Sequence, residues 1–330
     1  MARPARPHPA ARAHGGPAHG VSGRAWLLYG AMAILWGIPY LLIKEAVDSF
    51  SPAAIVAGRT LLGALILLPL AIRRGALRPA LKLWPWVLAF GAIEMAGPFF
   101  LLGHAELTLP SGLTGLLVAT VPLFAAGIAL ARGDRTMLSP TRAAGLAIGF
   151  LGVGVIVAGP GLAVADPASA LGALGEVLLV AFLYAVAPFI VATKLARVPS
   201  IGTITLSLLA VGIAYLPVAL LTQHEVPTVR STVSLVALGI LCTAVAFLAF
   251  FALIGEVGPV RAPLFTYVNP VVAIALGIVV LGEDLSGGLL IGFPIVLVGC
   301  WLAATGGRLR PRREGGAPDQ PSLPEPLPRP

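Results

Sequence analysis

The sequence is poor in charge. Only 11% of its 330 residues are Asp, Glu, Lys or Arg, whereas 58% are hydrophobic. A soluble domain carries about 25% charged and about 45–50% apolar residues. So few charges cannot cover the surface of a soluble chain of this length, which excludes a soluble enzyme, a disordered chain and a nucleic-acid-binding protein. The class that remains is a polytopic membrane protein.

Residues that commonly carry catalysis or bind metals are scarce. The only cysteines, Cys242 and Cys300, stand inside apolar runs and are interpreted as small buried hydrophobes, not as a disulfide or a metal site. The five histidines fall in predicted tails or loops, and the sequence contains no HExxH, GxSxG or P-loop motif. The sequence therefore predicts no catalytic site, no metal and no cofactor, and it disfavours ATP-driven transport by this chain alone.

The two ends of the chain lack long hydrophobic runs. Residues 1–24 are rich in Pro, Ala and Arg and have no apolar core, so we expect no cleavable signal peptide. Residues 306–330 combine Pro, Gly and charge without periodicity. Both segments are predicted to be disordered cytoplasmic tails.

Between the tails, apolar runs dominate the sequence. A helix needs about 20 mainly apolar residues to cross a bilayer. Ten runs approach this length: Trp26–Ile43, Ala53–Ile72, Trp84–Gly103, Ser111–Ala131, Ala143–Ala158, Leu171–Thr193, Ile201–Leu221, Val233–Phe251, Ala262–Leu281 and Leu289–Ala304. The fifth and tenth runs are short, so their helices are expected to extend into the flanks. Because the runs are continuously apolar, they favour an all-α integral membrane protein over a β-barrel.

The positive charges predict the orientation of these ten helices. If the N-terminus is cytoplasmic, the inner segments hold 19 of the 22 Lys and Arg residues, and the outer loops hold only Arg230. The outer loops instead carry acidic residues, namely Glu45, Asp48, Glu106, Asp166, Glu225, Glu283 and Asp284. This asymmetry predicts that both termini are inside, and it explains the net charge of +8 without a nucleic-acid partner.

The two halves of the chain repeat each other at an offset of about 148 residues. Pro39 pairs with Pro188, Pro122 with Pro270, and a Gly-acidic turn at 133–134 with one at 282–283. Each repeat, 25–160 and 161–305, contains five predicted helices. Because five is odd, the second copy must insert upside down relative to the first. Inverted repeats that meet at the membrane midplane are typical of alternating-access transporters.

The chain resembles the drug/metabolite transporter superfamily, EamA type. Trp36-Gly37, Lys44, Ser51-Pro52 and Gly58-Arg59 resemble the family's opening pattern. The stretch TAVAFLAFFALIGEVGPVRAPLFTYVNPVVAIALGIVVLGEDL resembles its second-half pattern, with matches at Thr243, Phe247, Gly258, Pro259, Arg261, Pro270, Gly282 and Glu283. One departure is Asp134, where the family usually has Glu. The resemblance covers about residues 25–305 and implies ten helices, a central substrate path and export of amino acids, metabolites or drugs.

Glu94 is the carboxylate predicted to lie nearest the membrane midplane, about ten residues from either end of its run. A charge at that depth costs roughly 2.5–3.5 kcal/mol on insertion scales. We interpret Glu94 as a protonatable group that couples substrate to proton movement. The alternative is a neutral, hydrogen-bonded residue that holds two helices together.

Arg59 and Glu176 are predicted to lie at similar depth on the outer side, roughly 8–10 Å inside their helix ends. They could pair, or bracket a zwitterionic solute, with Arg59 taking a carboxylate and Glu176 an amine. Arg59 could instead snorkel to the interface or form an ion pair that supports the fold. Glu176 could be an interface residue.

The remaining site candidates are neutral. Aromatic belts sit at membrane interfaces, so aromatic residues at greater depth indicate either a cavity wall or helix packing. The aromatic candidates are Trp36, Tyr40, Tyr184 and Tyr267. Asn269 precedes a proline that frees a backbone carbonyl, and Thr243 offers a hydroxyl that could also bond to its own helix. Glycines on the fifth and tenth helices, including Gly145, Gly149, Gly152, Gly288 and Gly292, predict either packing within the fold or a homodimer seam.

These features together predict a carrier in the cell inner membrane. It would move a small organic solute, in the export direction, by alternating access, with proton coupling through Glu94. Its partners would be the solute and the bilayer, with the chain a monomer or a homodimer. The alternatives are an integral membrane enzyme acting on a lipid, which would need a polar cluster at one membrane face, and a channel, which would need a more polar lining.

Overall fold

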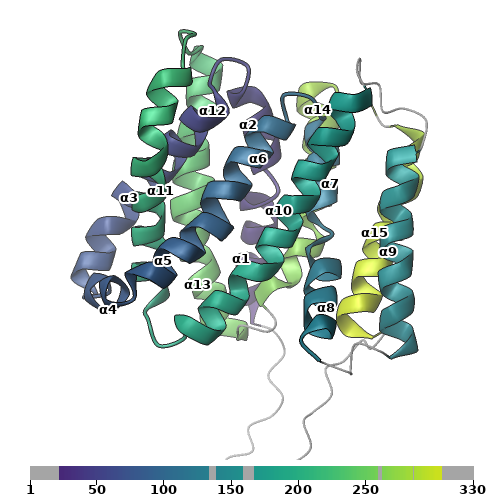
Figure 1. Ribbon diagram of the computed structural model, residues 1–330, viewed down its shortest axis with the longest axis horizontal. Coiled ribbons are helices and arrows are strands. Elements are labelled where there is room, and N and C mark those ends of the chain that lie inside the picture. The colour runs from purple at the N-terminus through teal and green to yellow at the C-terminus, as the bar shows by residue number, and fades with distance from the viewer. Residues whose placement is uncertain (1–21, 134–138, 159–166, 259–261, 285, 307–330) are drawn as a thin grey trace, which may run out of the picture.

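The computed structural model describes residues 22–133, 139–158, 167–258, 262–284 and 286–306, and all regular structure in these ranges is helical (Figure 1). Each predicted apolar run forms helix. The helices of the first half are α1 (Gly23–Leu35), α2 (Pro39–Ala46), α3 (Pro52–Arg73), α4 (Leu77–Lys82), α5 (Trp84–Gly91), η1 (Ala92–Ala96), α6 (Gly97–Ala105), α7 (Ser111–Val118), α8 (Val121–Ala131) and α9 (Pro140–Ala158). The second half holds α10 (Pro167–Lys194), α11 (Ser200–Thr222), α12 (Val229–Gly239), η3 (Ile240–Val245), α13 (Ala246–Val257), η4 (Ala262–Tyr267), α14 (Asn269–Leu281) and α15 (Gly287–Thr305).

Within the described ranges, eight helical segments are long and apolar enough to cross a membrane, and α9 and α15 are two shorter apolar helices. Both of these helices begin before their predicted runs, at Pro140 and Gly287, which confirms the expected extension into the flanks. The protein is thus an all-helical membrane protein.

The first helix starts earlier than predicted. Ser22 caps α1, since its Oγ accepts a hydrogen bond of 3.1 Å from the N–H of Ala25. Arg24, which we had placed in the N-terminal tail, lies in α1 and pairs with Glu256 at 2.9 Å. The rest of the two predicted tails, residues 1–21 and 307–330, lies outside the described residues.

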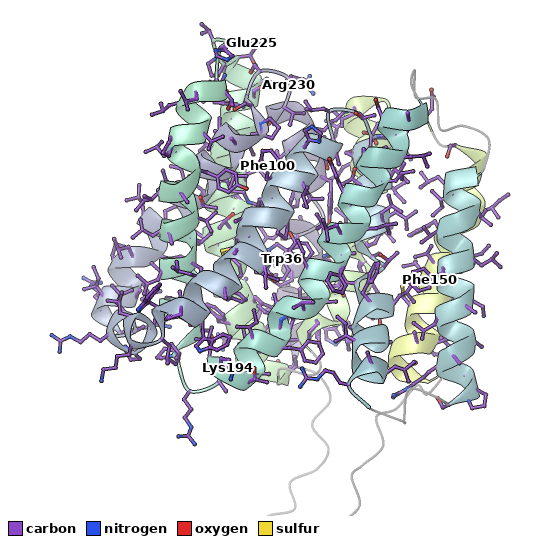
Figure 2. The ribbon with its side chains drawn as sticks, in the orientation of Figure 1. Trp36, Phe100, Phe150, Lys194, Glu225 and Arg230 are labelled. Carbon is purple, nitrogen blue, oxygen red and sulfur yellow. The ribbon has the colours of Figure 1, made fainter. Side chains whose placement is uncertain are left out.

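The helix bundle has two opposite ends. Glu225 and Arg230 lie at the end drawn uppermost, and Lys194 lies at the opposite end (Figure 2). We call these the upper end and the lower end. Helix α1 begins at the lower end, whereas α10, the first helix of the second half, begins at the upper end (Figure 1). The first helices of the two halves therefore run in opposite directions through the bundle.

Several helices are interrupted within the bundle. The break between α1 and α2 precedes Pro39, and the break between α7 and α8 precedes Pro122. Two more interruptions are π-helical turns, η1 and η3, which begin at residues 92 and 240, 148 residues apart. They therefore lie at equivalent positions of the two repeats. Such turns are often found at functional sites.

Helices α9 and α15 pack closely through glycines. A Cβ at Gly299 would lie 2.4 Å from Cα of Gly149, and one at Gly145 would lie 2.4 Å from N of Ala303. Both contacts are to backbone, which cannot swing aside as a flexible side chain can. The glycine face of α9 is thus occupied inside the fold, as the packing interpretation predicted.

We expect Gly299→Ala to lower the melting temperature of the detergent-purified protein. The added methyl group forces the two helix backbones apart, and overpacking costs about 1–3 kcal/mol. Gly154→Ala on α9 is the matched control, because a Cβ there meets nothing within 4 Å. Both changes gain the same helix propensity, so equal melting temperatures would contradict the close packing.

Candidate functional site

Arg59 joins the two halves of the protein in the interior. It lies on α3 with only 6% of its surface exposed, and its Nε donates a 3.0 Å hydrogen bond to Oγ1 of Thr243 in η3. Its guanidinium carbon lies 3.8 Å from the ring centroid of Phe99 on α6. Arg59 is therefore held in the bundle between a hydroxyl and an aromatic face, and the snorkelling interpretation is wrong.

The local structure around Thr243 explains why Arg59 is fixed there. The Thr243 hydroxyl donates to the carbonyl of Leu238, five residues earlier, at 2.8 Å, so its lone pairs face Arg59. Gly63 lets η3 approach α3, because a Cβ at Gly63 would lie 2.7 Å from the methyl of Thr243. The bond back to its own helix, one of the two predicted roles, is thus present together with the bond to Arg59.

The two terminal amino groups of Arg59 remain available. Within the described part of the chain, Nε is the only one of its nitrogens that donates to protein. Tyr40, Tyr184 and Cys242 lie within electrostatic range of the guanidinium. Tyr40 is 7% exposed and Tyr184 is half-buried. A planar cation with two free amino groups in a buried setting suits a carboxylate or another planar anion.

Glu94 lies close to the same group of residues. It stands in η1, is half-buried, and forms no hydrogen bond or ion pair to any described residue. Tyr184 on α10 is within electrostatic range of Glu94, Tyr40 and Arg59. We call Arg59, Thr243, Tyr40, Tyr184 and Glu94 the central cluster. The central cluster contains residues from both repeats, and one residue from each π-helical turn.

Glu176 is not brought to Arg59. Its carboxylate accepts from His104 Nδ1 at 2.9 Å from both oxygens, and its side chain is 25% exposed. His104, which we expected in a loop, lies in the last turn of α6. The predicted pairing of Arg59 with Glu176 is therefore absent, because the two residues belong to separate polar contacts.

The other three predicted residues pack away from the central cluster. The Trp36 ring contacts three phenylalanine rings with centroids 5.1–5.8 Å apart: Phe247, Phe250 and Phe265. Tyr267 lines a groove with Leu297, Val298 and Trp301. Asn269 is 9% exposed, and in the amide orientation that satisfies its neighbours it donates to the carbonyls of Ala33 and Phe265 at 3.2 Å. For Trp36 these contacts correspond to the helix-packing alternative, whereas the Asn269 amide binds backbone carbonyls of α1 and η4.

Phe99 and Cys242 lie beside Arg59 of the central cluster, but the sequence analysis did not select them as site candidates. Cys242 stands 148 residues after Glu94, so the repeat offset is a signal that places the two at equivalent positions. Nothing in the sequence distinguishes Phe99 from the apolar residues around it.

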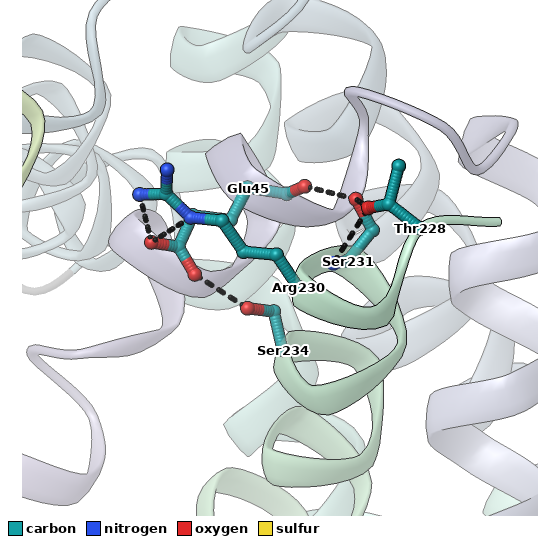
Figure 3. Close-up of polar contacts among 5 residues, drawn as sticks. All are labelled: Glu45, Thr228, Arg230, Ser231 and Ser234. Atoms are coloured by element: carbon teal, nitrogen blue, oxygen red, sulfur yellow. Dashed lines mark hydrogen bonds and ion pairs between the residues drawn. The ribbon is translucent and has the colours of Figure 1, made fainter.

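Polar contacts join the two halves at the upper end. Arg230 donates to Oε1 of Glu45 at 2.6 Å, and Ser234 donates to its Oε2 at 2.5 Å (Figure 3). Ser231 donates to the backbone carbonyl of Glu45 at 2.7 Å. Nearby, the Gln223 amide donates to the carbonyl of Ser49 at 2.7 Å. Polar side-chain contacts therefore join the two halves at the upper end, as the Arg24–Glu256 pair joins them at the start of α1.

Interrupted apolar helices from two halves that meet around buried polar groups are the arrangement of membrane transporters. The comparison with known families agrees with this geometry. The EamA-like transporter family matches residues 24–158 and 172–305, and the chain belongs to this family. It is accordingly a multi-pass membrane transporter and not an enzyme.

Relatives of similar length carry transporter names. The inner membrane transporter YedA of Escherichia coli is 26% identical, over 87% of this chain and 93% of its own. The transporter YvbV of Bacillus subtilis is 26% identical over 86% and 92%. A protein of Streptantibioticus cattleyicolor named as a probable terminal-alkyne amino-acid exporter is 26% identical over 92% and 98%. A solved crystal structure shares the fold, with a TM-score of 0.59 at 22% identity, over 84% of this chain and 96% of its own.

Proposed function

We propose that the protein exports a small amino-acid-like solute by alternating access. The observation that carries this proposal is Arg59, a buried cation at the boundary of the two repeats with two terminal amino groups unused by the described protein. These two groups match the two oxygens of a carboxylate. The name of the Streptantibioticus relative, an amino-acid exporter, supports the same substrate class.

Glu94 supplies the second half of the proposed site. We place the ammonium group of a solute bound to Arg59 on the side of Glu94, because Tyr184 is within electrostatic range of both residues. The ammonium group and a proton would then compete for the Glu94 carboxylate. Because an ionised carboxylate in the membrane interior is costly, the carrier would reorient with Glu94 bound to either the solute or a proton. Such competition couples export to proton entry.

The proposed topology has ten spans in two inverted repeats, with both termini in the cytoplasm. The upper end then faces the outside and the lower end faces the cytoplasm. Arg73, Arg74, Arg78, Lys82 and Lys194 all belong to lower-end segments, which supports this orientation. The upper-end contacts of Glu45 and Gln223 would help to hold the outer side closed in the cycle.

Reporter fusions test this topology. Fusions within residues 73–82 and after Arg313 are expected to report the cytoplasm, and fusions within residues 222–230 the outside, because the positively charged segments stay inside. The paired use of a reporter active only in the cytoplasm and one active only outside controls for expression. An external C-terminus would contradict both the ten-span count and the inverted repeats.

Counterflow in liposomes tests the proposed substrate class. Proteoliposomes loaded with a neutral amino acid should take up the labelled amino acid with saturable kinetics. The corresponding amine, which lacks the carboxylate, is the matched control and should not exchange, because nothing would then pair with Arg59. A thermal-shift screen of the purified protein selects the amino acids to test, since a bound ligand raises the melting temperature. Exchange of the amine as fast as the amino acid would overturn the assignment.

A further inference from the structure

One buried carboxyl group has no part in the proposed transport cycle. Glu106 follows α6 and lies in the connection to α7, at the upper end of the bundle. The sequence places it in a loop between two apolar runs, yet it is 0% exposed. Glu225, in another upper-end connection, is exposed (Figure 2). The burial of Glu106 therefore does not follow from its position between helices.

Both carboxyl oxygens of Glu106 lack a hydrogen-bond partner within the described residues, and so does the hydroxyl of Ser111. Ser111 is also 0% exposed and begins α7. An ionised carboxylate that is buried and unpaired costs far more than a neutral carboxylic acid.

The charged neighbours of Glu106, Lys44 and Glu283, form hydrogen bonds with backbone groups and not with the Glu106 carboxyl group. Lys44 on α2 donates to the backbone carbonyl of Glu106 at 2.5 Å and to that of Leu109 at 3.1 Å, not to the carboxyl group. Glu283, after α14, accepts from the N–H of Ser111 at 2.6 Å and of Gly112 at 3.0 Å. The charges of Lys44 and Glu283 offset each other. An ionised Glu106 would leave one net negative charge in the cluster, and a neutral Glu106 would leave none.

We propose that Glu106, with the facing groups Lys44, Glu283 and Tyr40, forms a second proton-binding site at the upper end. Glu106 carries a proton while the two halves are closed there and releases it when they part and water enters. The site is separate from Glu94, which lies in η1 inside the span. The assignment of the upper end to the outside of the cell rests on the proposed function. With that assignment, the proton that binds Glu106 comes from the outer solution.

The electrostatics of Glu106 agree with this geometry. Burial raises the pKa of the Glu106 carboxyl well above its usual range, Glu283 raises it further, and Lys44 opposes the shift. Water would remove most of the burial effect in an open state. The closed state therefore binds the proton more tightly than the open state. Rising pH at the upper end destabilises closure, and falling pH stabilises it.

Infrared spectra of the full-length protein in lipid test whether the site binds a proton. Glu94→Gln is the background, so that Glu94 cannot contribute a protonated carboxyl band. In this background we expect one carboxylic-acid carbonyl band to persist at neutral pH and to disappear on adding Glu106→Gln. Adding Glu225→Gln instead, at an exposed carboxylate, should leave the band unchanged. Absence of the band in the Glu94→Gln protein, or its survival in the double variant, would overturn the proposal.

Two neighbouring changes test the site without altering Glu106. Glu283→Gln should move the pH midpoint of the band to lower pH, because it removes the negative neighbour, and Lys44→Gln should move it to higher pH. Unchanged midpoints would show that the band does not belong to this cluster. Loss of the band on adding Na⁺ at constant pH would show that the site takes a metal cation and would overturn the proton assignment.

The spectroscopic result is independent of the substrate. If no amino acid shows counterflow while the band responds as expected, the proposed function fails and the proton site stands. If counterflow succeeds and the band is missing, the exporter stands and the proton site fails.

Discussion

Arg59→Ala is expected to reduce amino-acid counterflow to the background of empty liposomes, while the protein still accumulates in the membrane. The substitution removes the two amino groups that would bind the solute carboxylate. A hydrogen bond to a charged group contributes about 1.5–3 kcal/mol, so even one lost bond corresponds to roughly a 10- to 150-fold loss. Arg59→Lys keeps the charge but loses the planar pair of donors, and should weaken transport several-fold.

Arg230→Lys is the matched control for Arg59→Lys. Arg230 also joins the two halves, but its side chain is 61% exposed and its partner is Glu45. An exposed ion pair contributes about 0–1 kcal/mol, so this change should cost less than about fivefold. Full transport by Arg59→Lys would show that Arg59 does not bind the solute carboxylate through a planar pair of donors. If the Arg59→Ala protein failed to accumulate in the membrane, Arg59 would instead be required for folding.

Glu94→Gln is expected to abolish the response of transport to a pH gradient while exchange of solute for solute continues. Glutamine has the shape of protonated glutamic acid but cannot release a proton, so no group in η1 could then couple the two flows. The measurement is uptake into proteoliposomes with and without an imposed pH difference, in both proteins.

Glu176→Gln is the matched control for Glu94, because Glu176 is also a carboxylate on a spanning helix but pairs with His104. It should leave the gradient response intact. A Glu94→Gln protein that responds as strongly as the unmodified protein would show that Glu94 does not couple transport to protons, and would favour facilitated transport.

The helices were predictable because most of the apolar runs are long and are bounded by polar or turn residues. The run predicted at 111–131 ends at the residues observed, although the span is interrupted before Pro122. Arg59 could also be selected as a candidate from the sequence, because a cation within an apolar run is rare.

Contacts between helices were not predictable in the same way. Depth in the membrane follows from position along a run, and Arg59 and Glu176 were placed at equal depth. Their separation depends on the direction in which each side chain points around its helix and on which helices are neighbours, and a single sequence reveals neither. The burial of Glu106 was not predictable for a related reason. A position between two apolar runs indicates a connection, but the packing of that connection against Lys44 depends on tertiary structure.

The π-helical turns have a consequence for the rotational phase of the spans that contain them. A residue in an α-helix advances by about 100° and about 1.5 Å, so the extra residue of a π turn rotates everything beyond it by that angle relative to the preceding segment. Helix α6 is thereby turned relative to α5, and this rotation brings Phe99 to face Arg59. Deleting one residue from η1 would turn Phe99 to another side of the span. No single hydrophobic stripe can therefore describe that helix along its full length.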